Sequence, residues 1–136
     1  MSIETDELRA ELNRIASVIS MPAGTSLFRC GEPVSGIFII REGTVRMTLD
    51  SAGDVFPARI FGPGEILGLP ATLTGQYSLS AAVHEDAELA FIPARRVNEL
   101  LECSPRLCLV ATRMMSSEIA RMRASLRDGV QPAAHH

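Results

Sequence analysis

The sequence contains no lysine, so all thirteen of its basic residues are arginines. Sixteen Asp and Glu residues outweigh them and leave a net charge of −3, which argues against a domain built to hold a polyanion. No apolar run approaches the roughly 18 residues that a membrane-spanning helix needs. With 136 residues, 46% of them apolar, the chain is expected to form one globular domain that contacts neither nucleic acid nor membrane.

Cysteine is also scarce. Cys30, Cys103 and Cys108 make an odd number, and the charged N-terminus does not resemble a secretory signal. The sequence therefore predicts a cytoplasmic protein without a disulfide framework, whose cysteines are small buried or half-buried thiols.

Motifs for catalysis are missing. The sequence has no G-x-S-x-G nucleophile motif and no pair of His or Cys residues at helical spacing that would indicate a metal site. His84 is the only histidine outside the closing segment PAAHH, and it is expected on the surface, where a strand enters a turn. We therefore expect no enzyme, metal or cofactor, and we exclude the 129–136 tail from function, whether its two histidines are natural or the remnant of a purification tag.

Helical patterns flank the chain. Leu8, Leu12, Ile15 and Ile19 form one apolar stripe, which predicts a helix over residues 5–20 within an N-terminal segment 1–23. Residues 93–128 predict two more helices. Pro93 begins a short one that ends near Glu102, and Ser104 and Pro105 begin a long one.

Between these helices, residues 24–92 predict strands. Nine of the ten glycines fall in this part and separate short runs such as GIFII, TVRMTL and ELAFI. Val45, Met47 and Leu49 alternate with polar residues, as expected for a half-buried strand. Many short strands with turn signals between them favour a mainly β sandwich or barrel, here an antiparallel roll of about eight strands.

The long helix shows two apolar faces. One is a heptad-like seam of Cys108, Thr112, Met115, Ile119, Met122 and Leu126, and the other combines Leu107, Val110, Ala111 and Met114. One interpretation is a helix that lies wholly in its own core. The other is a helix that docks on the roll and pairs with a second copy of the chain through Met115, Ile119, Met122 and Leu126.

The order of these elements resembles the cyclic nucleotide-binding domain, in particular the sensor domain of regulators of the catabolite activator and fumarate–nitrate reductase type. The resemblance rests on residues 23–47, FGPGE (61–65), residues 78–93 and the closing helices. It implies a double-stranded β-helix, or jelly roll, with an N-terminal helix, a short helix and a long dimerisation helix. It also implies a DNA-binding domain of on the order of 70 residues that would follow this chain.

In that family a loop called the phosphate-binding cassette holds the ligand. Backbone amides and an Arg bind the cyclic phosphate, a Glu accepts from the ribose hydroxyl, and a Thr or Ser of the long helix reads the purine. Matching the motif along this sequence places Leu69 at the Glu position, Tyr77 at the Arg position and Met122 at the Thr position. The implied effector contacts are Gly68, Leu69, Pro70, Ala71, Tyr77, Ser78 and Met122.

The three replacements predict weak nucleotide binding. Losing the Arg pair and the ribose acceptor removes roughly 3–6 kcal/mol, or about two to four decades of affinity. Arg59 or Arg46 is an alternative cation, and a different register would make Glu65 the ribose acceptor. The glycines and the helix N-terminus would still attract an anion weakly. The expected effector is therefore an anion or a more apolar small molecule, or there is no effector.

Two functions follow from this pattern. The first is a regulatory sensor whose effector shifts the long helix of a homodimer. The second is a ligand-free dimerisation module whose pocket is filled by its own side chains. An open cavity at Leu69, Tyr77 and Met122 favours the sensor, and a closed one favours the scaffold.

Overall fold

The computed structural model describes residues 3–48, 50–51, 54–55, 59–117 and 120. The helices are α1 (Ile3–Arg14), α2 (Ala71–Thr74) and α3 (Ala94–Cys103), and a further helix has its described residues at 105–117 and 120. The strands are β1 (Ser17–Met21), β2 (Ser26–Phe28), β3 (Gly36–Thr48), β4 (Asp50–Ser51), β5 (Asp54–Val55), β6 (Arg59–Phe61), β7 (Ile66–Leu67) and β8 (Ser80–Pro93).

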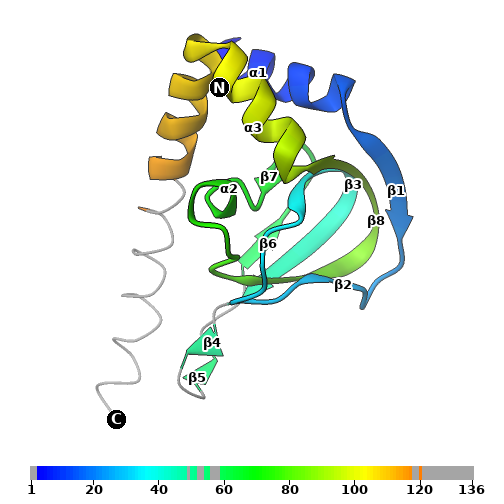
Figure 1. The fold of residues 1–136 in the computed structure, drawn as a ribbon. Coiled ribbons are helices and arrows are strands. Elements are labelled where there is room, and N and C mark those ends of the chain that lie inside the picture. Colours follow the sequence, from blue (N-terminus) through cyan, green and yellow to red (C-terminus); the bar gives the residue numbers. More distant parts are fainter. Residues whose placement is uncertain (1–2, 49, 52–53, 56–58, 118–119, 121–136) are drawn as a thin grey trace.

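These strands form an antiparallel roll. The main sheet runs β1-β8-β3-β6, with β2 also paired to β8 and β7 to β3, and β4 and β5 form a separate hairpin. Figure 1 shows α1, α3 and helix 105–117 together at one end of the roll and the β4–β5 hairpin at the opposite end. The predicted fold, mainly β with flanking helices, is confirmed.

The two long strands differ from the sequence prediction. GIFII and TVRMTL were expected as separate strands, but β3 continues through both, and β8 likewise joins two predicted runs. The pairing of β3 with β8 shifts register at several places between Ile40 and Val45, so the strands bend without ending. Gly43 lies within this bend at φ +84°, a conformation that glycine adopts without steric cost.

The prediction of a helix over residues 5–20 was wrong in its last part. Helix α1 ends at Arg14, and Ser17–Met21 form β1, whose Ile19 lies opposite Leu89 of β8. Two β-branched residues, Val18 and Ile19, suit this edge strand. Residues 21–24 lie at the turn between β1 and β2, which is closed by the hydrogen bond from Thr25 N to Pro22 O at 3.2 Å.

The buried side chains form two apolar clusters. The helical cluster lies between the helices and the roll, and the roll cluster fills the roll itself. Leu8 and Leu12 of the predicted stripe are fully buried in the helical cluster. Leu107, Val110 and Ala111 join them there, which confirms that one face of helix 105–117 docks on its own domain.

The predicted starts of the last two helices are confirmed. Pro93 is the residue before α3, which ends at Cys103. The next helix begins at Pro105, where the Ser104 hydroxyl accepts from Leu107 N at 3.3 Å. Residues 121–128 of the predicted long helix lie outside the described residues. Within the described residues, no helix is long and apolar enough to cross a membrane.

Candidate functional site

The loop at residues 68–78, called the cassette below, carries every predicted effector residue except Met122, which lies outside the described residues. It leaves β7 at Gly68, forms the short helix α2 and reaches β8 after Ser78. Gly68 has φ +89° and Gly75, which caps α2, also has φ +89°. Both glycines supply turns that other residues rarely adopt, so the sequence pattern fixes the path of this loop.

The backbone amides of α2 bind carbonyls of the same loop. Ala71 N donates to Gly68 O at 3.1 Å, Thr72 N to Leu69 O at 3.1 Å and Gly75 N to Ala71 O at 2.8 Å. The Thr72 hydroxyl also donates to Leu69 O at 2.7 Å. These amides do not offer the open anion cradle that the sequence suggested, because each already has an acceptor within the chain.

The predicted effector residues point in different directions. Leu69, only 2% exposed, belongs to the helical cluster, together with Val97 and Leu101 of α3. Ala71 and Tyr77 belong to the roll cluster instead. Pro70 is half-buried and Ser78 is exposed. The structure therefore does not gather these side chains around one point, and an effector in contact with Leu69 would have to displace core packing.

Tyr77 is the most constrained residue of the cassette. Its hydroxyl donates to Gly36 O at 2.7 Å and accepts from Gly36 N at 3.1 Å and from Ser35 N at 3.2 Å. The Ser35 hydroxyl lies 3.1 Å from it. A buried phenol needs such partners, and these come from Ser35 and from Gly36, the first residue of β3. No feature of the sequence predicted that Ser35 and Gly36 would hold the Tyr77 side chain.

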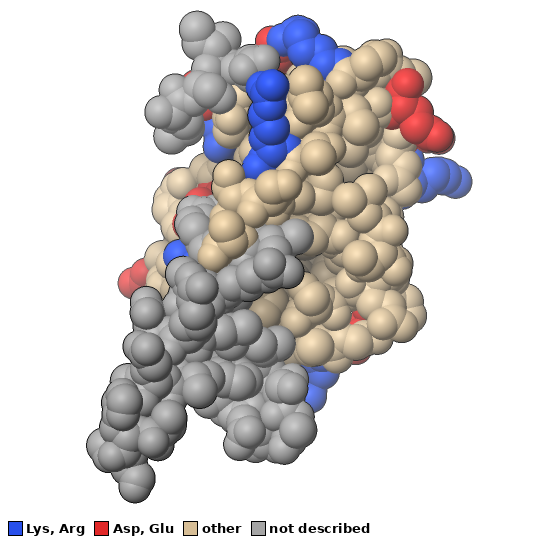
Figure 2. All heavy atoms as spheres, turned by 90° about the vertical axis from the view of Figure 1, so that its left-hand side faces the viewer, with Lys and Arg blue, Asp and Glu red and all other residues tan. Residues whose placement is uncertain are grey.

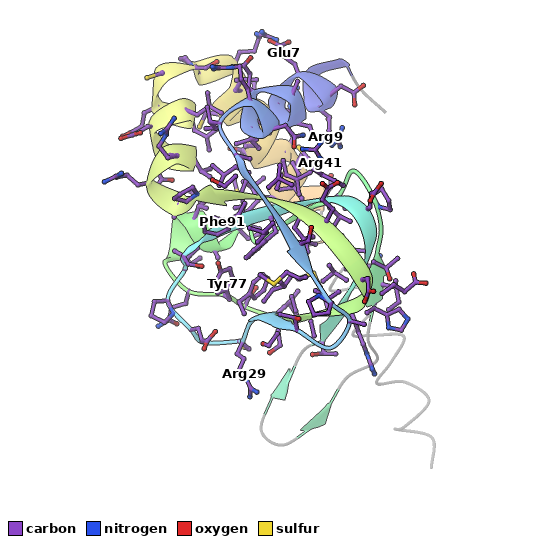
Figure 3. The ribbon with its side chains drawn as sticks, turned by 90° about the vertical axis from the view of Figure 1, so that its right-hand side faces the viewer. Glu7, Arg9, Arg29, Arg41, Tyr77 and Phe91 are labelled. Atoms are coloured by element: carbon purple, nitrogen blue, oxygen red, sulfur yellow. The ribbon has the colours of Figure 1, made fainter. Side chains whose placement is uncertain are left out.

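The Tyr77 ring is fixed as firmly as its hydroxyl. It stacks on Phe28 with ring centroids 3.8 Å apart and an interplanar angle of 8°. A Cβ atom added at Gly68 would lie 3.1 Å from the Tyr77 ring, so the glycine allows the close approach of the loop. Figure 3 shows Tyr77 inside the roll, whereas Arg29 points outward. At the position where the resemblance implies an arginine for a phosphate, this chain has a buried, hydrogen-bonded tyrosine.

The cassette also lacks charge. No Asp, Glu, Lys or Arg occurs from Ile66 to Val83. In Figure 2, residues other than Lys, Arg, Asp and Glu cover most of the described part of this face, and the blue and red side chains lie mainly in its upper part and along its edges. The cassette therefore supplies no cationic side chain of its own to an anionic ligand.

The FGPGE turn has a structural role. Glu65 accepts from Gly62 N at 3.0 Å through its carboxylate, and its backbone O accepts from Ile40 N at 3.0 Å. The alternative cations lie on the strands nearby: the Arg59 guanidinium carbon lies 5.5 Å from the centroid of the Phe61 ring, and Arg46 is exposed. The Glu65 carboxylate closes its own turn, which gives it a role that does not involve a ribose.

Helix α1 links this turn to helix 105–117. Arg9 Nε donates to Gly64 O at 2.6 Å, and Arg106 Nη1 donates to Glu7 at 2.7 Å. A second hydrogen bond joins the same guanidinium and carboxylate. Arg106 lowers the pKa of Glu7 below its usual range, mainly through its hydrogen bonds to the Glu7 carboxylate.

The predicted dimer residues fall only partly within the described structure. Ile119, Met122 and Leu126 lie outside it. Met115 is 5% exposed and belongs to the helical cluster of its own chain, whereas Cys108 and Thr112 of the same seam are exposed. Leu109 is 51% exposed on this helix. The exposed side of helix 105–117 thus includes Cys108, Leu109 and Thr112.

Other candidate residues lie on the surface. Cys30, Cys103 and Cys108 are all exposed thiols without a disulfide, so the expectation that they are buried or half-buried was wrong. They occupy a loop, a helix end and the solvent side of a helix, where the fold does not cover them. His84 is exposed as expected, although it lies within the continuous strand β8 and not at a strand end.

A surface hollow of about 340 Å³ lies between the end of β1 and the bend of β3 and β8. Its lining residues are Ser20, Met21, Pro22, Glu42, Asp86, Ala87 and Glu88. Asp86 is engaged there, since its carboxylate accepts from Ala23 N at 2.8 Å. None of the predicted effector residues lines this hollow.

The fold and the cassette agree with a known family. The model of the cyclic nucleotide-binding domain family matches residues 18–103, from β1 through the cassette to the end of α3. The chain belongs to this family. As a cyclic nucleotide-binding domain, it keeps the roll, the cassette loop and the following helices, and it has Tyr77 at the end of the cassette.

Several known proteins are similar to this chain. The transcriptional activator protein Anr of Pseudomonas aeruginosa is 34% identical over 97 residues, which cover 71% of this chain and 40% of Anr. The catabolite activator protein of Thermus thermophilus superposes with a TM-score of 0.72 at 21% identity, over 93% of this chain and 59% of that one. A cGMP-bound form of the EAL enzyme Bd1971 gives a TM-score of 0.62 at 23% identity, over 76% of this chain and 28% of that one. The two structural similarities show the shared fold.

Proposed function

We propose that this chain is the effector-sensing domain of a transcription regulator and that its effector is not a cyclic nucleotide. The observation that carries the proposal is Tyr77, whose hydroxyl binds the Ser35–Gly36 backbone at the position where the resemblance implies a phosphate-binding arginine. The uncharged stretch from Ile66 to Val83 supports the same conclusion, because no cassette cation replaces that arginine. The similarity to the transcriptional activator Anr supports a role in transcription.

The rest of the proposal concerns partners. The chain acts in the cytoplasm as a homodimer, takes no cofactor and performs no reaction of its own. A DNA-binding domain in the same protein contacts nucleic acid, and the domain described here senses a small molecule or anion. The chain spans 40% of Anr, which leaves room in a protein of that length for such a further domain.

A second candidate is a ligand-free dimerisation module. The burial of Leu69 and Tyr77 favours it, because these side chains already fill the space that they were expected to line. Titration separates the two candidates. An effector that binds stoichiometrically and changes DNA affinity in the longer protein supports the sensor, and a protein whose DNA affinity no small molecule alters supports the scaffold.

Cyclic AMP and cyclic GMP are expected to bind this chain with dissociation constants weaker than about 100 μM, because neither an arginine pair nor a ribose acceptor is available on the cassette. Isothermal titration at physiological salt measures this directly. A stoichiometric, low-micromolar response to either nucleotide would contradict the proposal. Glu65→Ala and Arg59→Ala then test the alternative register, since both abolish that response only if these residues hold the ligand.

Replacing Ile119 by Glu is expected to convert the dimer to monomers. The substitution places a carboxylate opposite its own two-fold copy in the predicted seam, where like charges repel. Sedimentation at tens of micromolar measures the association state. Ser117→Glu is the control, because Ser117 is exposed and lies off the seam. An unaltered chain that is already monomeric at this concentration would refute the seam.

A further inference from the structure

The hydroxyl of Tyr77 joins two parts of the chain that are far apart in sequence. Four groups of Ser35 and Gly36 surround it at 2.7–3.2 Å: the amide N of each, the Gly36 carbonyl and the Ser35 hydroxyl. A single phenol oxygen thus fixes both peptide groups at the point where the β2–β3 loop enters β3. The two bonds to Gly36 are buried, so water cannot easily replace them if they break.

The same two residues hold the beginning of α3. Ser35 O accepts from Ala94 N, the first amide of α3, at 3.0 Å. Gly36 pairs with Pro93 at the end of β8, and an added Cβ there would lie 2.2 Å from Ile92 O. Gly36 is therefore pressed against the strand that leads into α3. Whatever moves Ser35 and Gly36 must also move the start of that helix.

Backbone bonds attach the cassette to the same loop. Tyr77 N donates to Glu32 O at 3.0 Å, Gly31 N donates to Tyr77 O at 2.8 Å and Val34 N donates to Gly75 O at 2.9 Å. The cassette end, the β2–β3 loop and the first turn of α3 thus form one connected set of hydrogen bonds. The Tyr77 side chain is the part of this set that reaches both Ser35 and Gly36.

We propose that Tyr77 is a built-in latch, a positioning residue whose hydroxyl holds the cassette, the β2–β3 loop and the start of α3 together without any ligand. Its regulatory meaning rests on the proposed function: a sensor with this latch keeps its cassette in one arrangement when no effector is bound. The effector must then act by opening or reinforcing the Tyr77–Ser35–Gly36 contact and not by supplying a missing anion to an empty cradle.

Site-resolved amide hydrogen exchange on the 136-residue chain tests the latch. Tyr77→Phe keeps the ring and its stacking on Phe28 but removes the hydroxyl. We expect exchange at the amides of Ser35, Gly36 and Ala94 to quicken by about tenfold or more, the factor for loss of about one hydrogen bond. Thr25→Val is the matched control, because it also removes one hydroxyl bonded to a backbone carbonyl, Pro22 O, but outside this set. It should leave the three amides within about twofold of the unaltered chain.

Two results would overturn the latch. One is unchanged exchange at these three amides in Tyr77→Phe, and the other is a uniform increase at all core amides, which a general loss of stability produces. If Tyr77→Phe does not fold, native-state hydrogen exchange of the unaltered chain in dilute denaturant tests the latch instead. The amides of Ser35, Gly36, Ala94, Gly75 and Tyr77 must then open as one unit, and different denaturant dependences refute the idea. Neither measurement involves a ligand. A result that refutes the latch is therefore distinct from a result that refutes the proposed effector function.

Discussion

Replacing Gly43 by alanine is expected to lower the free energy of unfolding by about 2–5 kcal/mol. Gly43 has φ +84°, which costs any residue with a Cβ. That Cβ would also lie 2.3 Å from Asp86 O and 2.7 Å from Ala87 Cα. Both atoms belong to the backbone of β8, so the neighbour cannot rotate away. The β3 and β8 strands would have to separate where both bend.

Gly24→Ala is the matched control for this prediction. Gly24 has φ +93°, but nothing lies within 4 Å of the added Cβ. It carries the conformational cost alone, about 1–2 kcal/mol. Urea denaturation of both variants measures the difference. Equal losses at the two positions would mean that the strands yield easily at Gly43 and that the close contact with β8 contributes nothing.

Much of the fold was predictable because glycine and proline fix local geometry. Gly24, Gly31, Gly43, Gly64 and Gly68 all adopt positive φ, so their spacing in the sequence marks real turns and bends. The same signal does not distinguish a turn from a bulge. For this reason Gly43 was expected to end a strand, whereas it bends one.

The error at the N-terminus has a different cause. Ile15 and Ile19 are four residues apart, which continues the stripe of Leu8 and Leu12 at helical period. Ile19 nevertheless lies on β1 and pairs with Leu89 of β8. Pairing with a strand seventy residues away decides the structure of this segment, and such a partner is not visible in a local pattern.

The sequence predicted where the candidate site lies in the chain, but not how its side chains are oriented. Motif spacing identified Tyr77 as the residue at the arginine position, and the structure shows it buried and bonded. Its partners Ser35 and Gly36 carry no distinctive signal. Leu69 was expected beside a ligand, yet it is buried in the helical cluster, which also includes Val97 and Leu101 of α3. It follows the turn at Gly68, and no periodicity extends through such a turn.

Introducing a carboxylate at the cassette position of Leu69 is expected to destabilise the domain by about 3–5 kcal/mol at neutral pH. Leu69 is 2% exposed and shares the helical cluster with Val97 and Leu101 of α3. Leu69→Glu would bury an unpaired charge there. The neighbouring Leu73→Glu is the matched control, because Leu73 is 71% exposed on the same loop. Surface substitutions of that kind change stability by about 0.5 kcal/mol or less.

The pH dependence of this loss identifies its cause. Burial raises the pKa of the introduced carboxyl in the folded state above its unfolded value of about 4.3. The loss is therefore complete above the raised folded pKa, shrinks as the pH falls through it, and is smallest below about 4.3. Thermal unfolding of Leu69→Glu and Leu73→Glu between pH 4 and pH 8 measures this difference. A loss that does not change with pH would point to poor packing and not to a buried charge.

Restoring the family's ligand residues is consequently expected to fail. The double variant Leu69→Glu with Tyr77→Arg supplies two of the three ligand side chains that the resemblance implies, but it places a carboxylate in the helical cluster and removes the hydroxyl bonded to Ser35 and Gly36. We expect no low-micromolar binding of cyclic AMP by isothermal titration and a lower midpoint in urea than for either single variant. A folded double variant that binds cyclic AMP stoichiometrically would show that these two side chains can reach a common ligand, and it would contradict the burial of position 69 in the helical cluster.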